Sequence, residues 1–188
     1  MTTPSEPPTD APGDPIVRKV LADVAARTPV DERERDSIEQ FLAIVPGLAR
    51  PFDEHADPVH VTGSALIVGR RGIVLLRHRR LGIWVQPGGH IDAGETPWEG
   101  ARREAVEETG LPLRPLGEPS ELAHVDVHDG GRGHTHLDLR YLFTAGDGDP
   151  APPPEESQEV GWYSWTEASH IAEARMGGVL VALASRFG

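Results

Sequence analysis

Residues 89–111 decide the fold, and they read Gly89-His-Ile-Asp-Ala-Gly-Glu95-Thr-Pro-Trp-Glu-Gly-Ala-Arg-Arg103-Glu104-Ala105-Val-Glu107-Glu108-Thr-Gly110-Leu111. Residues 96–99 (Thr-Pro-Trp-Glu) predict a helix that starts with a capping box, and Gly110 predicts its end. The helix would carry Glu104, Glu107 and Glu108 on one face. Their repulsion costs roughly a few tenths of a kcal/mol per pair, and a hard cation such as Mg²⁺ relieves it by binding carboxylate oxygens. The stretch therefore predicts a metal site that handles phosphates.

This stretch resembles the signature of the Nudix hydrolases, G-x5-E-x7-R-E-U-x-E-E-x-G-U, in which U is an apolar residue. The fixed positions are filled by Gly89, Glu95, Arg103, Glu104, Glu107, Glu108 and Gly110, and the apolar positions by Ala105 and Leu111. Alanine is a smaller choice than usual at its position. The resemblance implies an α+β Nudix fold, in which helices sandwich a mixed β-sheet, and cleavage of the diphosphate linkage of a nucleoside diphosphate derivative.

The resemblance also implies roles for individual residues. Glu104, Glu107 and Glu108 would be ligands of Mg²⁺ or Mn²⁺ or, for one of them, the general base. Gly89 would lend its backbone carbonyl to the metal. Arg103 would orient a carboxylate through its two-pronged donor geometry, and its alternative role is a surface ion pair with Glu107.

The resemblance also implies roles for two further sets of glutamates. Glu95 is expected behind the metal ligands, beside the arginine. Glu155 and Glu156 lie in a Pro-rich loop before the last predicted strand, where some relatives carry a catalytic loop carboxylate. The alternative for this pair is that both side chains are simply solvated.

Residues 122–128 and 134–143 predict a β-hairpin whose polar side chains alternate with apolar ones. With residues 129–133 as the loop, antiparallel counting gives the pairs His128 with His134, Asp126 with His136, and His124 with Asp138. One strand face would then carry four histidines and two aspartates.

This polar face is a second candidate site. His134, His136 and Asp138, together with His90 from the box, could contact the substrate or hold an additional metal such as zinc or manganese. The alternative is a solvated strand face without a specific role.

Composition limits the class of protein. The 188 residues carry 30 acidic and 18 basic side chains, a formal net charge of −12, which argues against a broad nucleic-acid or anionic-membrane surface. The absence of cysteine excludes disulfides and thiolate zinc sites. No signal peptide and no apolar run long enough to cross a bilayer is evident. We therefore expect a cytoplasmic protein without a membrane or nucleic-acid partner.

The chain divides into three predicted parts. Residues 1–15 are rich in proline and predict a disordered tail. Residues 16–50 predict a helical extension, with one helix to about Arg27 and a second capped by Thr28 and running to about Val45. This extension could cover an edge of the domain, form a dimer contact, or roof the substrate pocket. Residues 58–188 predict the Nudix domain, whose C-terminal helix is expected to break at Gly177-Gly178.

Two other functions share these features. One is a Nudix-fold sensor that binds a nucleotide without turning it over, although sensors typically lose box carboxylates. The other is an RNA-processing enzyme of the decapping type, against which the acidic net charge argues. The sequence leaves open which small nucleotide-type substrate is bound and whether the chain forms a homodimer.

Overall fold

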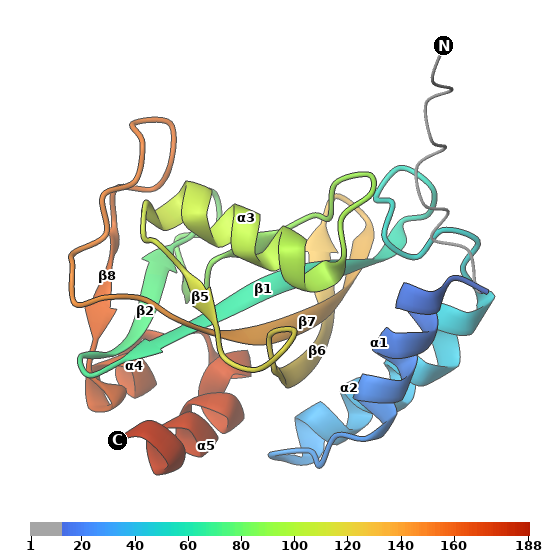
Figure 1. Ribbon diagram of the computed structural model, residues 1–188, viewed down its shortest axis with the longest axis horizontal. Coiled ribbons are helices and arrows are strands. Elements are labelled where there is room, and N and C mark those ends of the chain that lie inside the picture. Colours follow the sequence, from blue (N-terminus) through green and yellow to red (C-terminus); the bar gives the residue numbers. More distant parts are fainter. Residues whose placement is uncertain (1–12) are drawn as a thin grey trace.

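Helices cover both faces of a mixed β-sheet in the computed structural model, which describes residues 13–188 (Figure 1). The α-helices are α1 (Pro15–Ala25), α2 (Glu32–Ile44), α3 (Pro97–Thr109), α4 (Trp165–Ile171) and α5 (Gly177–Phe187), with 3₁₀ turns at Val45–Gly47 and Ala174–Met176. The strands are β1 (Val59–Gly69), β2 (Gly72–Arg77), β3 (Trp84–Val85), β4 (Gly88–Gly89), β5 (Arg114–Pro115), β6 (Leu122–Gly131), β7 (His134–Thr144) and β8 (Val160–Tyr163). The α+β fold expected from the sequence is confirmed.

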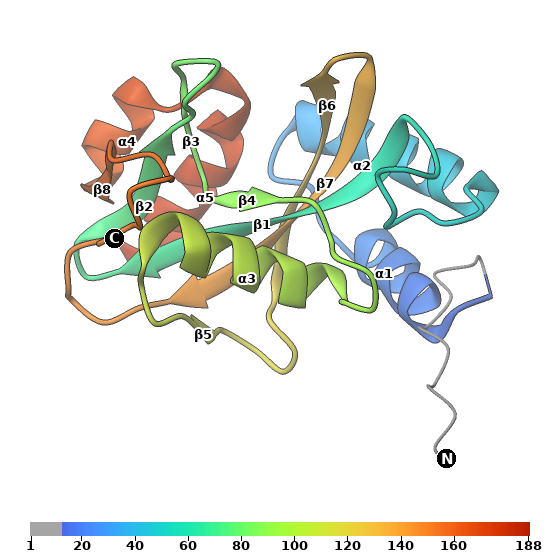
Figure 2. The ribbon, with the colours of Figure 1, turned by 90° about the horizontal axis from the view of Figure 1, so that it is seen from above.

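The sheet is built around a parallel pair, β1 and β7, whose register runs from Val59 opposite Thr135 to Val68 opposite Thr144. The strand order is β3-β2-β1-β7-β5; β4 adds to β1, β6 to β7 and β8 to β2, all antiparallel. Helix α3 lies along one face, and α4 and α5 lie on the other (Figures 1 and 2).

Alternating side chains of β1 build a separate core on each face. Val61, Ala65 and Ile67 belong to the core beneath α3. Leu66 and Val68 belong to the core beneath α4 and α5. The period of two residues along a strand produces this division. Toward the start of β1, the second face carries the polar side chains of His60, Thr62 and Ser64 instead.

The box helix α3 forms as its sequence predicts. The Thr96 side chain caps the helix in a capping box with Glu99, and Gly110 ends it in the left-handed conformation with φ of 68°. Ala105 is fully buried against the sheet, which explains the small residue in the apolar position of the signature. The helix is therefore fixed at both ends and along its buried side.

The N-terminal helices cover an edge of the sheet, one of the three expected arrangements. Helix α2 packs along β6, where the Val125 amide donates to Glu34 and the Val127 amide donates to the Ser37 hydroxyl. Arg27 donates to the Leu122 carbonyl. An uncovered edge strand would present these groups to other chains, so α1 and α2 protect it.

Two helix boundaries differ from the expectation. Helix α2 begins after Asp31, whose side chain accepts from the Glu34 amide, and the predicted cap at Thr28 is wrong. The C-terminal helical region breaks at residues 172–176, and Gly177 starts α5 instead of interrupting it. In both places a nearby carboxylate, Asp31 or Glu173, caps the following turn. The predicted disordered tail falls almost entirely on residues 1–12, outside the described part.

The register of the β6–β7 hairpin also corrects the sequence count. His128 pairs with His136 and Asp126 with Asp138, a shift of two residues from the expected pairs. The turn is shorter than predicted, because Gly131, Arg132 and Gly133 take positive φ angles and an irregularity lies between Asp129 and Gly131. A shift of two keeps every side chain on its predicted face.

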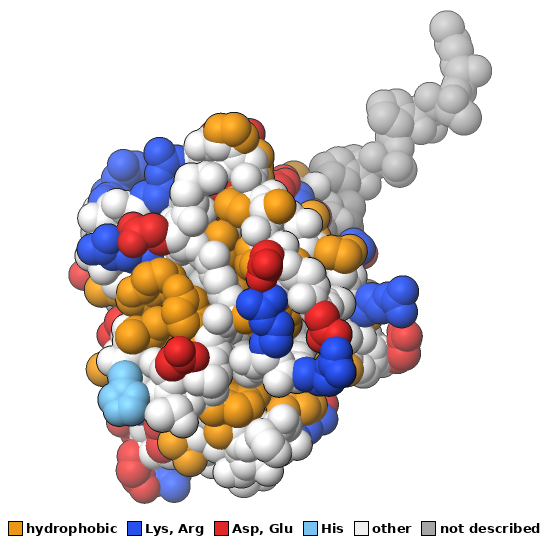
Figure 3. All heavy atoms as spheres, turned by 90° about the vertical axis from the view of Figure 1, so that its left-hand side faces the viewer, with side chains coloured by type: hydrophobic (Ala, Val, Ile, Leu, Met, Phe, Trp, Pro, Cys, Tyr) orange, Lys and Arg blue, Asp and Glu red, His pale blue; other side chains and the backbone are white. Residues whose placement is uncertain are grey.

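The surface on the β8, α4 and α5 side mixes charges of both signs. In the space-filling view of this side, basic side chains lie next to acidic ones and hydrophobic side chains gather in separate small groups (Figure 3). This face presents no continuous basic stripe. None of the helices within residues 13–188 combines the length and apolar character needed to cross a bilayer.

Candidate functional site: a glutamate corner and a histidine-lined cleft

Glu104 and Glu108 of α3 lie against the short strand β4, and Glu107 lies next to them on the helix; with Gly89 we call these three glutamates the glutamate corner. Glu108 accepts a hydrogen bond of 2.9 Å from the Gly88 amide. Glu104 lies against Gly89 so closely that a Cβ at this position would come within 2.6 Å of its carboxyl carbon. Glu107 is exposed. A side chain at position 89 would therefore displace the Glu104 carboxylate.

Arg103 donates hydrogen bonds to several groups at the glutamate corner. Its guanidinium donates to Glu95 at 3.0 Å, to Glu104 at 2.8 Å and to Glu107 at 3.3 Å. It also donates to the His90 carbonyl at 3.0 Å. Both arrangements considered from the sequence, the carboxylate-orienting contact and the i,i+4 pair, are therefore present. Glu95 serves as the anchor of the arginine.

Burial makes the negative charge of the corner unfavourable. Burial raises the pKa of Glu108 to about 8, against the hydrogen bond from Gly88, and repulsion from Glu104, Glu156 and Glu107 adds to the effect. Burial also raises the pKa of Glu104, although Arg103 opposes it. A bound cation would stabilise the ionised carboxylates.

The two loop glutamates are not equivalent. Glu156 is half-buried and close enough to Glu108 to raise its pKa. Glu155 is exposed, and its backbone carbonyl accepts from Arg79. Glu156 is therefore the loop glutamate whose charge acts on Glu108 in the glutamate corner.

A cleft of about 530 Å³ lies on the other side of β4. Its walls include the imidazoles of His90, His128, His134 and His136, and exposed Arg80 and Arg132 also line it. The volume is in the range of small-molecule sites, which is about 300–1,000 Å³. Gly88 and Gly89 line the cleft as well, so one strand is shared between cleft and corner.

The floor of the cleft is a buried hydrogen-bond network around Asp138. This carboxylate accepts from Ser64 at 2.8 Å, from Thr62 at 3.1 Å and from Arg140 at 2.9 Å. Gln86 adds a longer contact of 3.3 Å. Asp138 is therefore engaged in holding the guanidinium of Arg140.

Arg140 extends the network to the outer strand. It donates to Asp126 at 3.0 Å and lies 3.4 Å from His124 Nδ1. Burial opposes ionisation of Asp126, but His128, Arg140 and Arg33 outweigh it and hold its pKa well below the usual range. His128 Nδ1 lies 3.0 Å from Asp126 without the alignment of a hydrogen bond. Burial and the neighbouring Arg140 hold the pKa of His124 far below its ordinary value, so this imidazole is neutral.

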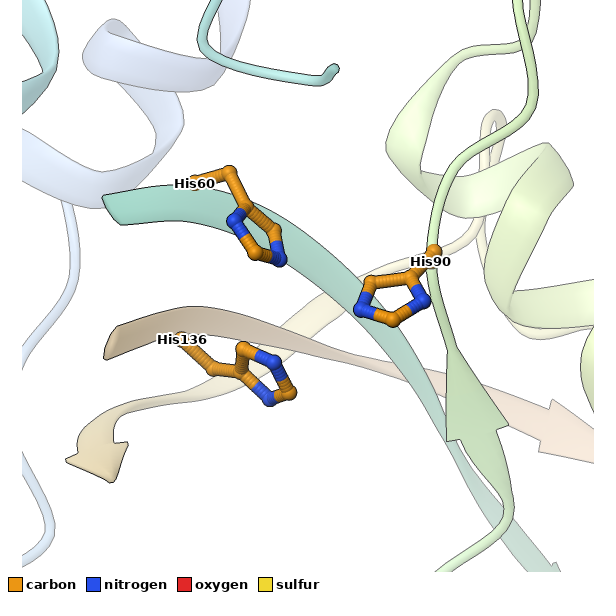
Figure 4. Close-up of side chains that lie close together, drawn as sticks. All are labelled: His60, His90 and His136. Atoms are coloured by element: carbon orange, nitrogen blue, oxygen red, sulfur yellow. The ribbon is translucent and has the colours of Figure 1, made fainter. Parts of the chain in front are cut away.

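Three imidazoles converge at the end of the cleft: His60 from β1, His90 after β4, and His136 from β7 (Figure 4). We call them the histidine cluster. One ligand nitrogen from each ring lies within 4.8 Å of the other two, and no other group of three metal-ligating side chains in residues 13–188 is this tight. Burial and the adjacent imidazoles of His128, His60 and His90 lower the pKa of His136 to about 4.

The sequence predicted two members of this cluster and missed the third. His90 and His136 are brought together, His134 lies beside them with its ring centroid 5.3 Å from that of His60, and Asp138 belongs to the network below. His60 was not predicted, although His60, Thr62 and Ser64 alternate as polar residues along β1. This alternation is the signal that would have found it, combined with the parallel pairing to β7.

Comparison with known proteins identifies the family of the chain. A family model described as NUDIX domain matches residues 58–182. The chain belongs to the Nudix hydrolase family. A crystal structure of a NUDIX-family hydrolase from Clostridium perfringens shares its fold, with 26% identity and a TM-score of 0.56 over 68% of this chain and 95% of that one.

Two curated relatives of this Nudix hydrolase have similar identity but match a smaller share of the chain. A probable DHNTP pyrophosphohydrolase from Lactococcus lactis subsp. cremoris is 27% identical over 89 residues, which are 45% of this chain and 54% of that protein. Phosphatase NudJ from Escherichia coli K12 is 26% identical over 117 residues, which are 61% of this chain and 72% of that protein. The chain thus spans about half the length of the first relative.

Proposed function

We propose that this Nudix hydrolase is a metal-dependent pyrophosphohydrolase that cleaves the diphosphate linkage of a nucleoside diphosphate derivative by attack of water on phosphorus. The observation that carries the proposal is the packing of Glu104 and Glu108 against Gly88 and Gly89. Two carboxylates with raised pKa values are held there, where their ionised forms need a cation. Sequence relatives named as a pyrophosphohydrolase and a phosphatase support the same class of reaction.

The donor set fits a hard divalent cation. Glu104, Glu107 and Glu108 offer carboxylate oxygens, and Gly89 offers a backbone carbonyl, the oxygen donors that Mg²⁺ and Mn²⁺ prefer. When bound, such ions would neutralise charge on the diphosphate and make a water more acidic. The family generally uses divalent cations; Mg²⁺ or Mn²⁺ is our choice for this member.

The chain's own residues orient the reacting groups. Arg103, anchored on Glu95 and the His90 carbonyl, fixes the direction of the Glu104 carboxylate. For the general base we propose Glu108 or, from the loop, Glu156. Glu108 has a pKa near neutrality, and Glu156 is the half-buried loop glutamate that faces it.

The cleft provides a place for the remainder of the substrate. It borders β4 directly, and Arg80 and Arg132 offer positive charge at its edge. A nucleoside diphosphate derivative is anionic and of the size that this volume holds. The acidic net charge of the chain is compatible with a small substrate, because bound cations reverse the local field.

The test is phosphate or nucleotide release from a substrate panel of nucleotide sugars, ADP-ribose, dinucleoside polyphosphates, CDP-alcohols and nucleoside triphosphates. Each compound is incubated with wild-type protein in Mg²⁺, in Mn²⁺ and in EDTA. We expect turnover of one class that EDTA abolishes. Tight binding of a nucleotide without turnover under either metal would instead identify a sensor and contradict the proposal.

A further inference from the structure

We propose that His60, His90 and His136 form a second metal site, separate from the glutamate corner, which binds a borderline divalent transition ion such as Zn²⁺. Three imidazole nitrogens select ions of this class over Mg²⁺, which prefers oxygen. The proposal concerns binding at these three side chains and stands independently of the reaction proposed above.

The first support is the geometry of the rings. The centroids of His60 and His90 are 5.2 Å apart, those of His60 and His136 are 5.1 Å apart, and those of His90 and His136 are 5.4 Å apart. The rings are steeply inclined to one another, at 52° to 87°, and are not stacked. Figure 4 shows them facing one common space from three separate segments. Ligand nitrogens within 4.8 Å of one another can meet around a single ion after small side-chain rotations.

The second support is that buried nitrogen atoms in this space lack partners. His60 is fully buried, and its Nε2 has no hydrogen-bond partner. The Nε2 of His90 is also buried without a partner. Buried polar atoms are normally hydrogen-bonded, so a pair of unpartnered nitrogens in one place points to a ligand.

The third support is the way the other nitrogens of these rings are held. His60 Nδ1 lies 3.2 Å from the Asp57 carbonyl, an acceptor that requires the Nδ1–H tautomer. His90 Nδ1 lies 3.2 Å from a carboxylate oxygen of Glu54. A carbonyl or carboxylate on one ring nitrogen fixes the tautomer that leaves the other nitrogen free as a metal ligand. Both histidines thus carry the outer contacts typical of metal-binding imidazoles.

The site is open on one side. His90 and His136 line the cleft, whereas His60 lies buried behind them. Three protein ligands leave one position of a tetrahedral ion free, and here that position would face the cleft. A water or a substrate oxygen in the cleft is the chemical class that would complete the coordination.

Zinc binding to the chelator-stripped protein tests the proposal. A chromophoric chelator competes for Zn²⁺ in millimolar Mg²⁺, which is added to compete with Zn²⁺ for the carboxylates of the glutamate corner. We expect one equivalent of tightly bound Zn²⁺, with an affinity that falls by about a hundredfold in His60→Gln and His136→Gln and by about tenfold in Glu54→Gln. His170→Gln, which alters an exposed histidine outside the cleft, and Glu107→Gln should bind like wild type.

A second variant and a second readout guard against misfolding of the buried positions. His90 is half-exposed, so His90→Gln should fold normally and still lose affinity. Co²⁺ in place of Zn²⁺ should give visible absorption bands of a nitrogen-ligated ion, absent in His90→Gln. Zinc affinity that is unchanged in all histidine variants, or that falls in Glu107→Gln or is displaced by Mg²⁺, would overturn the proposal.

Discussion

The glutamate corner and the histidine cluster meet at the same short strand but are built in opposite ways. The corner draws its three carboxylates from one helix, within five residues, and adds a backbone glycine. The cluster draws one ring from each of three segments, which the parallel pairing of β1 with β7 and the return of β4 bring together. The first is a local motif and the second is a product of sheet topology.

The two regions also differ in charge. Arg103 offsets only part of the negative charge of the corner, and burial raises the pKa values of Glu104 and Glu108. Burial instead lowers the pKa values of His136 and His124, so these two imidazoles are neutral. One region therefore suits a hard cation bound by oxygen, and the other suits a borderline cation bound by nitrogen. Each of the following predictions tests one side of this contrast.

The largest effect is expected at the corner. Glu108→Gln removes a charged ligand or base while preserving shape, so we expect turnover to fall by about three orders of magnitude, which corresponds to about 4 kcal/mol. Steady-state kinetics gives the rate, and circular dichroism checks that the variant is folded. Zinc affinity at the histidine cluster should not change. A folded Glu108→Gln protein with near wild-type turnover would refute the role of this residue.

A smaller effect is expected at the shared strand. In Gly89→Ala the added Cβ would displace the Glu104 carboxylate, and a shift of about 1 Å in a reacting group costs about a hundredfold in rate. Gly146→Ala is the matched control, because nothing lies within 4 Å of a Cβ there. Comparison of kcat for the two alanine variants measures the effect. Equal rates would show that the position of Glu104 does not matter.

The smallest effect concerns the neutral state of the buried His124 imidazole. The pKa of His124 is lowered in the folded chain, so only the unfolded chain takes up a proton below about pH 6.5. Stability is therefore complete above that pH and falls as the pH drops, by about 2 kcal/mol at pH 5 from this residue.

Urea unfolding of wild type and His124→Gln at pH 7.5 and pH 5 measures this contribution. The variant should lose about 2 kcal/mol less between the two pH values. His170→Gln, at an exposed position, should follow wild type. A loss that is the same in wild type and His124→Gln would mean that His124 is charged in the folded protein.

The sequence predicted what depends on neighbours along the chain. Thr96 and Glu99 start α3 and Gly110 ends it, as their capping preferences require. The faces of the hairpin were also predicted, because side chains alternate with a period of two. The predicted register of the hairpin was wrong, because spacing alone does not reveal the tight turn at Gly131–Gly133 or the irregularity before it.

What the sequence could not predict depends on distant pairing. His60 joins His136 only because β1 runs parallel to β7 in one particular register. The burial of Asp126, Asp138 and Arg140 follows from the same pairing together with the cover of α2 over β6. The polar strand face, for which the sequence left a binding site and a solvated surface as alternatives, contributes Asp138 and Arg140 to the floor of a cleft.

The central claim, that water attacks phosphorus under the glutamate corner, is tested most directly by hydrolysis in water labelled with oxygen-18. The best substrate of the panel is incubated with wild-type protein and Mg²⁺, and mass spectrometry locates the label in the products. We predict that one labelled oxygen enters a phosphoryl group at each turnover and that EDTA prevents product formation. Label on a carbon-bound hydroxyl oxygen instead of a phosphoryl group, or hydrolysis that continues in EDTA, would contradict the account.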